Sequence, residues 1–397
     1  MLRIPFFSIL FWILTSVTFF LNSENFLLVS PRVEILFLVF IIAIAIGALL
    51  FSQLTSNKHV DIYLFVFQKN LYFKILLYIF ITLLFFLAYR ALSHGLFDLN
   101  KRNLLFSPQA NEGNQAFGVM VVFLKGLLTP LVNFSLLYSL IKKNLRLLII
   151  TSALIFADSL IFQSRGIIFS MFLIIILYGL VSISNKRQGS LSQDTFKGSF
   201  YLFLLLTFST LLVIAKLRNL PLITSILESF MIGPVIFSNL VSSISNHSNN
   251  IINLSELPLL FSGADYLITI FLRGIFHLQI ESIGYDWIKF ISQEIVTSSI
   301  DNNFYTHNAF YTILAEPYLA MNIFGVILLG IFLGFILSKL SFTYIKFGCE
   351  FSLFLLSYVW VIINTGFFGN ALASPILWLF LVALPFFKKY LFKRNKS

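Results

Sequence analysis

Long apolar stretches, separated by short polar connections, make up most of this chain. A helix needs about 20 apolar residues to cross the hydrocarbon core of a bilayer. Runs near this length predict about ten membrane-spanning helices, at residues 6–21, 33–54, 74–92, 116–140, 147–163, 166–183, 200–216, 318–338, 351–368 and 373–387. The first run is followed by Asn22-Ser23-Glu24 and not by a small-residue cleavage site, so we interpret it as an uncleaved span.

Composition supports this interpretation and excludes an ordinary soluble domain. Hydrophobic residues make up 58% of the chain and charged residues 11%, whereas soluble domains carry about 25% charged residues. We therefore predict one all-α polytopic membrane domain, residues 1–397, with 10–12 spans. The only cysteine, Cys349, excludes an intramolecular disulfide. Because no histidine or cysteine cluster has the spacing of a metal site, we expect no metal and no cofactor.

The positive-inside rule orients the predicted spans. If the N-terminus is cytoplasmic, the loop with Lys142, Lys143 and Arg146 lies inside, as does the basic C-terminal tail. Both ends of the chain are then cytoplasmic. We interpret the net charge of +11 as cytoplasmic anchoring charge on a bilayer-embedded protein, and we expect no nucleic-acid partner.

The largest region without a predicted span covers residues 217–308, on the external side. It contains two apolar stretches, 222–241, which is broken by Gly233-Pro234, and 259–276. Each is either a short interfacial or re-entrant helix or one of an additional pair of spans. The connector between them, residues 242–258, has no Lys or Arg, which favours an external position. An additional pair of spans would leave the orientation of the other spans unchanged.

Ionisable side chains at membrane depth cost roughly 2.5–3.5 kcal/mol each on insertion scales, so those that persist usually have a function. Four candidates map to the external half of the chain's predicted topology. They are Arg165, between Ser164 and Gly166 in a tight hairpin; Arg218, directly after the seventh span; Arg273, inside an apolar stretch; and His307, before Asn308.

Each candidate also has a structural interpretation. Arg165 either extends to lipid headgroups or pairs with Asp158, and Arg218 is an interfacial anchor. Arg273 needs an anion, which is either Asp265, Glu281 or a ligand. A lone histidine is more often structural, and Thr306 or Asn308 is a candidate cap for the following helix. Taken together, arginines that converge on one external face form a site for a doubly charged anion such as pyrophosphate. A nearby histidine can accept a proton at neutral pH.

Short motifs around these residues resemble a known group of bacterial membrane enzymes. Residues Thr306 to Tyr311, with Glu316 and then Asn322 to Val326, resemble the His-Asn, Glu and Gly-x-x-Gly stretch of O-antigen ligases and polymerases. Ser164-Arg165-Gly166 resembles the Ser-Arg hairpin of that superfamily. Met231 to Val235 and Phe261-Ser262-Gly263 resemble oligosaccharide repeat-unit polymerases of the Wzy type.

The resemblance implies a metal-independent glycosyltransferase of the bacterial cytoplasmic membrane. It would polymerise oligosaccharide repeat units linked to undecaprenyl diphosphate into a surface polysaccharide, with a chain-length-regulating co-polymerase as a possible partner. By the same resemblance, His307 would act on the acceptor hydroxyl. The diphosphate would bind to Arg165, Arg218 and Arg273, with Ser164, Asn308 and Glu316 in supporting positions.

Three alternatives stay open. The first is a ligase-like transferase with a different acceptor, and the second is a flippase for lipid-linked sugars. A flippase favours internal repeats and charges in both halves of the chain, whereas here no repeat is visible and the charges gather on one face. The third alternative is a membrane scaffold without catalytic activity.

Overall fold

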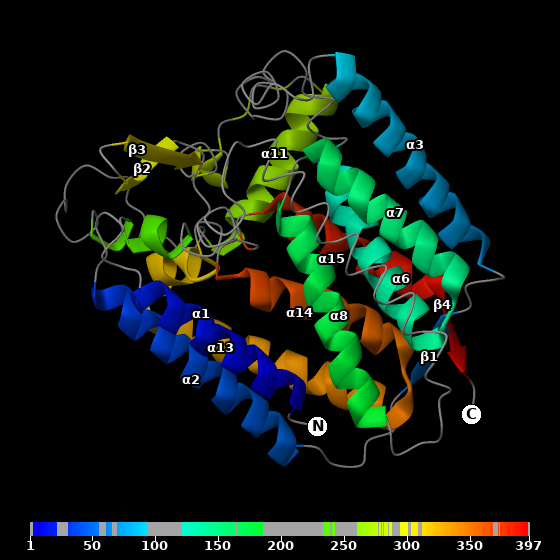
Figure 1. Cartoon of the computed structure of the whole chain (residues 1–397), viewed down its shortest axis with the longest axis horizontal. Coiled ribbons are helices and arrows are strands. Elements are labelled where there is room, and N and C mark those ends of the chain that lie inside the picture. The colour runs from blue at the N-terminus through cyan, green and yellow to red at the C-terminus, as the bar shows by residue number, and fades with distance from the viewer. Residues whose placement is uncertain are drawn as a thin grey trace.

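The computed structural model describes residues 3–21, 31–54, 61–65, 70–93, 121–162, 165–185, 233–238, 240–242, 260–276, 294–300, 303–308, 312–367 and 374–395, together with positions 278, 280, 282–284, 286–287 and 372. Helices dominate this part of the chain (Figure 1). They are α1 (Arg3–Leu21), α2 (Pro31–Leu54), α3 (Leu71–Ser93), the π-helix η4 (Leu124–Leu128), α6 (Thr129–Lys142), α7 (Leu145–Phe162), α8 (Arg165–Asn185), α11 (Ser262–Phe276), α13 (Ala315–Phe347), α14 (Glu350–Thr365) and α15 (Pro375–Leu391).

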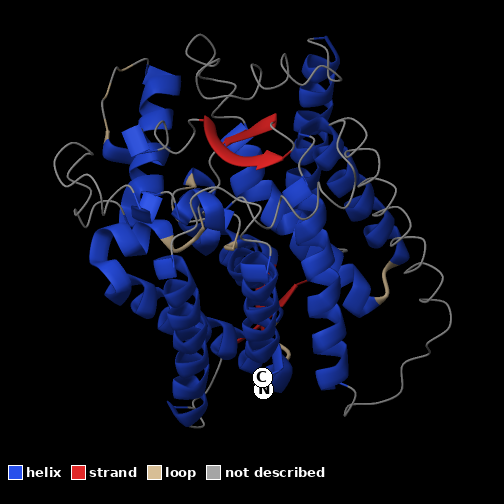
Figure 2. Ribbon diagram, turned by 60° about the vertical axis from the view of Figure 1, so that its left-hand side comes forward, coloured by secondary structure: helices blue, strands red, loops and turns tan. Residues whose placement is uncertain are grey.

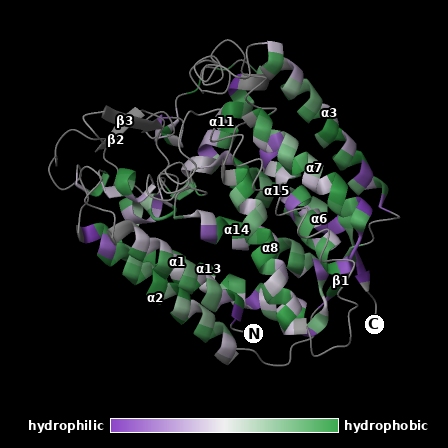
Figure 3. Cartoon of the chain, in the orientation of Figure 1, coloured by the Kyte–Doolittle hydropathy of each residue, from purple (hydrophilic) through white to green (hydrophobic). Residues whose placement is uncertain are grey.

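The chain is an all-α membrane protein in its main architecture. Five helical segments are long and apolar enough to cross a bilayer, namely Arg32–Ser52, Leu71–Tyr89, Val121–Lys142, Ile167–Ser184 and Ala315–Phe347. Helices also occupy the predicted spans at 6–21, 147–163, 351–368 and 373–387, whereas 200–216 lies outside the described residues. Figure 3 shows that apolar residues make up most of the length of the helices. The total of about ten crossings stays a prediction.

Two small antiparallel sheets, which the sequence did not predict, accompany the helices (Figure 2). Strand β1 (Ile62–Phe65) pairs with β4 (Phe392–Asn395), and β2 (Glu294–Ile300) pairs with β3 (Asn303–Asn308). All four strands are short, and β-branched or aromatic residues such as Ile62, Tyr63, Val296 and Tyr305 favour them. A search for apolar runs of about 20 residues does not detect strands of four to seven residues.

One end of the helix bundle carries β1, β4 and the connections at 142–144 and 348–350, and we call it the basic end. Glu350 holds it together, because its carboxylate accepts a hydrogen bond from the Phe65 backbone N–H at 2.6 Å and lies 2.9 Å from Lys142 Nζ. Three connections that are far apart in the sequence therefore meet at one carboxylate. The start of α1 and the end of β4 also lie at this end (Figures 1 and 2), as the predicted topology requires.

Helix α13 is broken near its start. Its 33 residues would measure about 50 Å as one straight helix, longer than a hydrocarbon core of about 30 Å. Asn322 has φ +57° and ψ −147°, which interrupts the helix. A Cβ atom at Gly325 would collide with the Pro317 carbonyl oxygen, so the short segment 315–321 folds tightly against the long one. The long segment therefore begins near Ile323, later than the predicted start at 318.

Helices α2 and α13 pack in close contact through small residues. A Cβ atom at Gly47 would collide with the backbone of Ile331, and one at Gly334 would collide with the backbone of Ile44. Close approach of this kind is how helices associate in lipid, where apolar burial between helices provides little driving force. This pair anchors the N-terminal hairpin to the C-terminal half of the chain.

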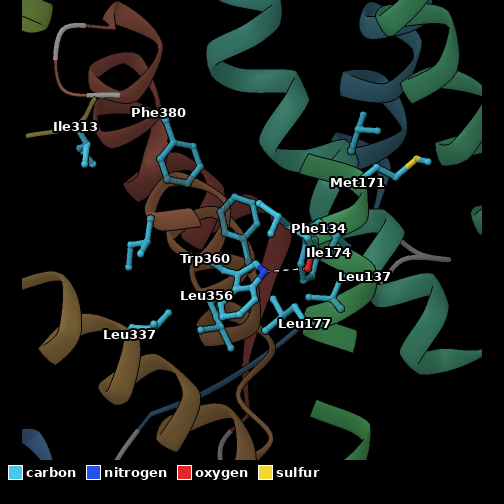
Figure 4. Packing of buried hydrophobic residues seen from close by; sticks show 14 of the residues in the cluster. Phe134, Leu137, Met171, Ile174, Leu177, Ile313, Leu337, Leu356, Trp360 and Phe380 are labelled. Carbon is cyan, nitrogen blue, oxygen red and sulfur yellow. Dashed lines mark hydrogen bonds between the residues drawn. The ribbon is translucent and has the colours of Figure 1, made fainter. Parts of the chain in front are cut away.

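Aromatic side chains fill the centre of the bundle. Trp360 of α14 is fully buried and donates its indole N–H to the Leu173 carbonyl oxygen of α8 at 2.8 Å. Figure 4 shows Trp360 directed toward α8, with Phe134 of α6 and Leu177 of α8 nearby. On the other side of the core, Trp12 of α1 donates to the Ile363 carbonyl oxygen at 3.0 Å. These contacts make α14 the central helix of the described fold.

Candidate functional site

The end of the bundle opposite the basic end gathers most of the predicted site segments, and we call it the far end. Because α6, α7 and α8 follow one another through short connections, the start of α8 lies opposite residues 142–144. The far end also contains α11, β2, β3 and the starts of α13 and α15 (Figure 1). The Ile313 backbone N–H donates to the Gly366 carbonyl oxygen at 2.8 Å, which joins the start of α13 to the end of α14.

The structure describes the backbone of three predicted site residues, Arg165, His307 and Asn308, but not their side chains. Arg165 is the first residue of α8. His307 lies in β3, paired with Ile295, and the neighbouring Asn308 is paired with Glu294. Ser164 and Arg218 lie outside the described residues. Whether the imidazole and the guanidinium groups share one cavity therefore stays a prediction.

The proposed capping role of Thr306 or Asn308 is wrong. Both residues belong to strand β3, and α13 begins only at Ala315, after the N-cap residue Leu314. The side chain that serves the start of this helix is that of Thr312, whose hydroxyl accepts a hydrogen bond from the Leu314 backbone N–H at 3.4 Å. Strand β3 ends at Asn308, and six residues separate it from the start of α13 at Ala315.

Arg273 is the one predicted arginine whose side chain is described, and it contacts a backbone carbonyl. Its Nε donates to the Ile280 carbonyl oxygen at 3.0 Å, and its Nη2 donates to the same oxygen. The carboxylate of Asp265, a predicted partner, accepts instead from the Gly284 backbone N–H at 2.7 Å. Glu281 lies outside the described residues. Arg273 therefore helps to fold the chain back along α11.

Glu316 is a buried carboxylate at the far end, with no exposed surface. Its Oε1 accepts the indole N–H of Trp287 at 2.8 Å, and Trp287 is itself 1% exposed. The acid stands at the start of the short segment 315–321, just before the break at Asn322. Broken helices at membrane depth occur where the backbone lines a cavity or is buried in protein, and here Glu316 and Trp287 are both buried.

Sequence reasoning missed the described charge pair at membrane depth, formed by Lys125 and Asp158. Both carboxylate oxygens of Asp158 lie close to Lys125 Nζ, at 2.6 and 2.7 Å. The side chains are 15% and 2% exposed. The signal was present, since each charge lies inside a predicted span. The sequence offered Asp158 only as an alternative partner of Arg165, which is nearer in sequence, and the tertiary structure was needed to pair Asp158 with Lys125.

The π-helix η4 places Lys125 for this contact. A π-turn is wider than an α-turn and occurs mostly as a short interruption of an α-helix, frequently at a functional site. Gly126 in the same turn packs against Leu379 of α15. Asp158 lies four residues before the end of α7, roughly 6 Å along the helix axis. The pair is therefore in the half of the bundle nearer the far end.

Among the described side chains, no group of three or more His, Cys, Asp or Glu residues gathers in one place. Comparison with known proteins adds no assignment: no family model, curated protein or solved structure matches the chain. The described part of the far end thus contains Arg273, Glu316 and the Lys125–Asp158 pair, with the backbones of Arg165 and His307.

Proposed function

We propose that this protein is a membrane glycosyltransferase that polymerises oligosaccharide repeat units carried on undecaprenyl diphosphate. The observation that carries the proposal is the shared location of its motif segments. The starts of α8 and α13, helix α11 and strand β3 all belong to the far end of the bundle. The positive-inside pattern assigns this end to the external face, where a lipid-linked glycan is available as donor.

In the proposed reaction, the acceptor hydroxyl oxygen bonds to the anomeric carbon of the donor glycan. The bond between that carbon and the diphosphate oxygen breaks, undecaprenyl diphosphate leaves, and His307 takes the hydroxyl proton. Because diphosphate is already a good leaving group, the protein mainly aligns the two glycans and stabilises developing negative charge. We assign that charge stabilisation to Arg165 and Arg218.

The guanidinium group of Arg273 is already engaged by the backbone. Its Nε and Nη2 already donate to the Ile280 carbonyl oxygen. Arg273 stays in the proposed diphosphate-binding set because the resemblance implies it. Ser164, Asn308 and Glu316 keep the supporting roles that the resemblance implies. For Glu316, this role is to hold the short segment 315–321 against Trp287.

The Lys125–Asp158 pair favours a second candidate, a transporter for lipid-linked sugars. Ionisable pairs inside a bundle mark substrate or ion pathways in transporters. The broken helix α13 is also a transporter feature. A ligase-like transferase shares the proposed chemistry and differs only in its acceptor. The three candidates predict different products in cells that lack the protein.

The test is to delete the coding sequence, complement it with variants, and separate the surface glycan on a gel by chain length. For a polymerase, deletion leaves single repeat units at the surface, and both His307→Ala and Arg165→Ala fail to restore long chains. For a transporter, deletion leaves no repeat units at the surface. For a ligase, long chains accumulate on the lipid carrier and are missing from the final acceptor.

Matched controls come from the other end of the predicted topology. His59→Ala and Arg146→Ala remove the same side-chain types from positions assigned to the cytoplasmic side, and both should restore long chains. Immunoblots of the membrane fraction must show equal amounts of all four variants. Long chains in both His307→Ala and Arg165→Ala cells would rule out the proposed site.

A further inference from the structure

Helix α11 and the chain that follows it form a hairpin closed by a ladder of polar contacts. Asp265, Thr269 and Arg273 lie four residues apart, on one face of the helix. The Asp265 carboxylate accepts from the Gly284 backbone N–H at 2.7 Å. Thr269 Oγ1 lies 2.9 Å from the Ser282 hydroxyl, and Arg273 donates to the Ile280 carbonyl oxygen. The polar face of α11 is thus directed to its own returning chain.

A second stripe along α11 is apolar and exposed. Phe261, just before the helix, is 57% exposed, and Ile268 and Phe276 are 58% and 63% exposed. The returning chain extends this surface with Leu278 and Ile283, at 49% and 45% exposed. Five large apolar side chains on one hairpin form a surface of the kind that marks contact with a membrane or a partner. We call these five residues the α11 apolar surface.

The opposite side of α11 packs on the bundle. A Cβ atom at Gly263 would collide with the Leu372 carbonyl oxygen and with the indole ring of Trp378. Gly263 lies five residues before Ile268, which places the two on roughly opposite sides of a helix with 3.6 residues per turn. Ile268 is therefore turned away from α15 and from the protein core, whereas Phe261 marks the edge of the α11 apolar surface next to α15.

The contact with α15 also sets the depth of α11. The rings of Phe261 and Trp378 lie with their centroids 5.6 Å apart. Trp378 is three residues inside the start of α15 at Pro375, which is roughly 4.5 Å along the helix axis. Trp is the residue enriched at the boundary between headgroups and acyl chains. The start of α11 therefore lies at the level of this boundary.

The length and direction of α11 together favour an interfacial position over a crossing. Its 15 residues measure about 22 Å, shorter than a hydrocarbon core of about 30 Å. In Figure 1 the helix runs across the direction of α3 and α7. Amphipathic helices with these properties lie in the interface plane, with their apolar face at the headgroup and acyl boundary.

We propose that the α11 hairpin is an interfacial membrane element, and that the α11 apolar surface contacts phospholipid acyl chains just below the headgroups at the far end. The bilayer is the occupant because the surface lies beside the outer end of a membrane-embedded helix and faces away from the protein. This inference is independent of the proposed enzymatic activity. It selects between the interpretations of residues 259–276 that the sequence left open.

The test measures the depth of single labelled cysteines in vesicles of the reconstituted full-length protein. Cys349 is the only native cysteine and is buried, so Cys349→Ser provides the background. An environment-sensitive fluorophore is attached at Ile268→Cys and, independently, at Phe276→Cys. Quenching is compared for phospholipids with a nitroxide near the headgroup end of the acyl chain, phospholipids with a nitroxide near its methyl end, and iodide in water.

Two control positions calibrate the scale. Val382→Cys lies in the middle of α15 and is 75% exposed in the native chain, so it should be quenched most by the deep nitroxide. Lys393→Cys lies on the exposed side of β4, so it should be quenched by iodide. We expect strongest quenching at positions 268 and 276 by the shallow nitroxide. Strongest quenching there by the deep nitroxide, by iodide, or by none of the three would overturn the proposal.

Discussion

The ammonium group of Lys125 lies 2.6 Å from one carboxylate oxygen of Asp158 and 2.7 Å from the other. The two residues come from different helices, and the carboxylate is 2% exposed. A charge in this position is tolerated because its counter-charge is in direct contact. The pair therefore couples the π-helix η4 to α7.

Removal of one partner should destabilise the protein far more than removal of both. Lys125→Ala leaves the Asp158 carboxylate buried without its ammonium partner, which typically costs about 3–5 kcal/mol. The double change Lys125→Met with Asp158→Leu should recover most of the loss, because apolar residues of similar volume replace such pairs well. Thermal unfolding of purified protein in detergent measures both effects.

Lys339→Ala is the control for this pair, because Lys339 is exposed at the other end of the bundle. It should leave the unfolding temperature unchanged. If Lys125→Ala behaves like Lys339→Ala, the pair has no energetic role in the fold.

Substitutions at the α2–α13 contact should show how closely these helices approach. Gly334→Ala places a methyl group against the backbone of Ile44, and forcing extra methyl groups into packed sites typically costs about 1–3 kcal/mol. Gly179→Ala is the matched control, because a Cβ atom there meets nothing within 4 Å. Thermal unfolding should separate the two variants, and equal unfolding temperatures would contradict the close contact.

The hydrogen bond between Trp287 and Glu316 should contribute more to the free energy of unfolding than the hydrogen bond between Trp378 and the Leu372 carbonyl oxygen. Trp287→Phe removes the indole donor to a carboxylate, and hydrogen bonds to charged groups contribute about 1.5–3 kcal/mol. Trp378→Phe removes an indole donor to the neutral Leu372 carbonyl oxygen, at 2.9 Å, for which about 0.5–1.5 kcal/mol is typical. Urea-induced unfolding in detergent compares the two losses, and a larger loss for Trp378→Phe would refute the assignment.

Accessibility to a membrane-impermeant thiol reagent tests the orientation. The pairing of β4 with β1 places residues 61–65 and 392–395 on the same side of the bundle, and the positive-inside rule makes that side cytoplasmic. Lys393→Cys in a Cys349→Ser background should react in intact cells only after permeabilisation. Equal reaction in intact cells would reverse the predicted topology.

Sequence alone predicted the fold class and the approximate positions of the described helices. An apolar run of about 20 residues is a local property, and in a bilayer every backbone polar group must be bonded within its own segment. This is why α2, α8 and α14 lie close to the predicted spans 33–54, 166–183 and 351–368. The site motifs could also be found in the sequence. Their location at one end of the bundle depends on the alternating direction of successive helices.

Tertiary structure alone decided which charge meets which. Asp158 is seven residues from Arg165 in sequence and 33 from Lys125, yet it contacts Lys125 because α6, which continues η4, packs against α7. In the same way, Arg273 donates to the Ile280 carbonyl oxygen, and α13 breaks at Asn322 within an apolar run. Such contacts depend on the packing of segments far apart along the chain, which hydropathy does not record.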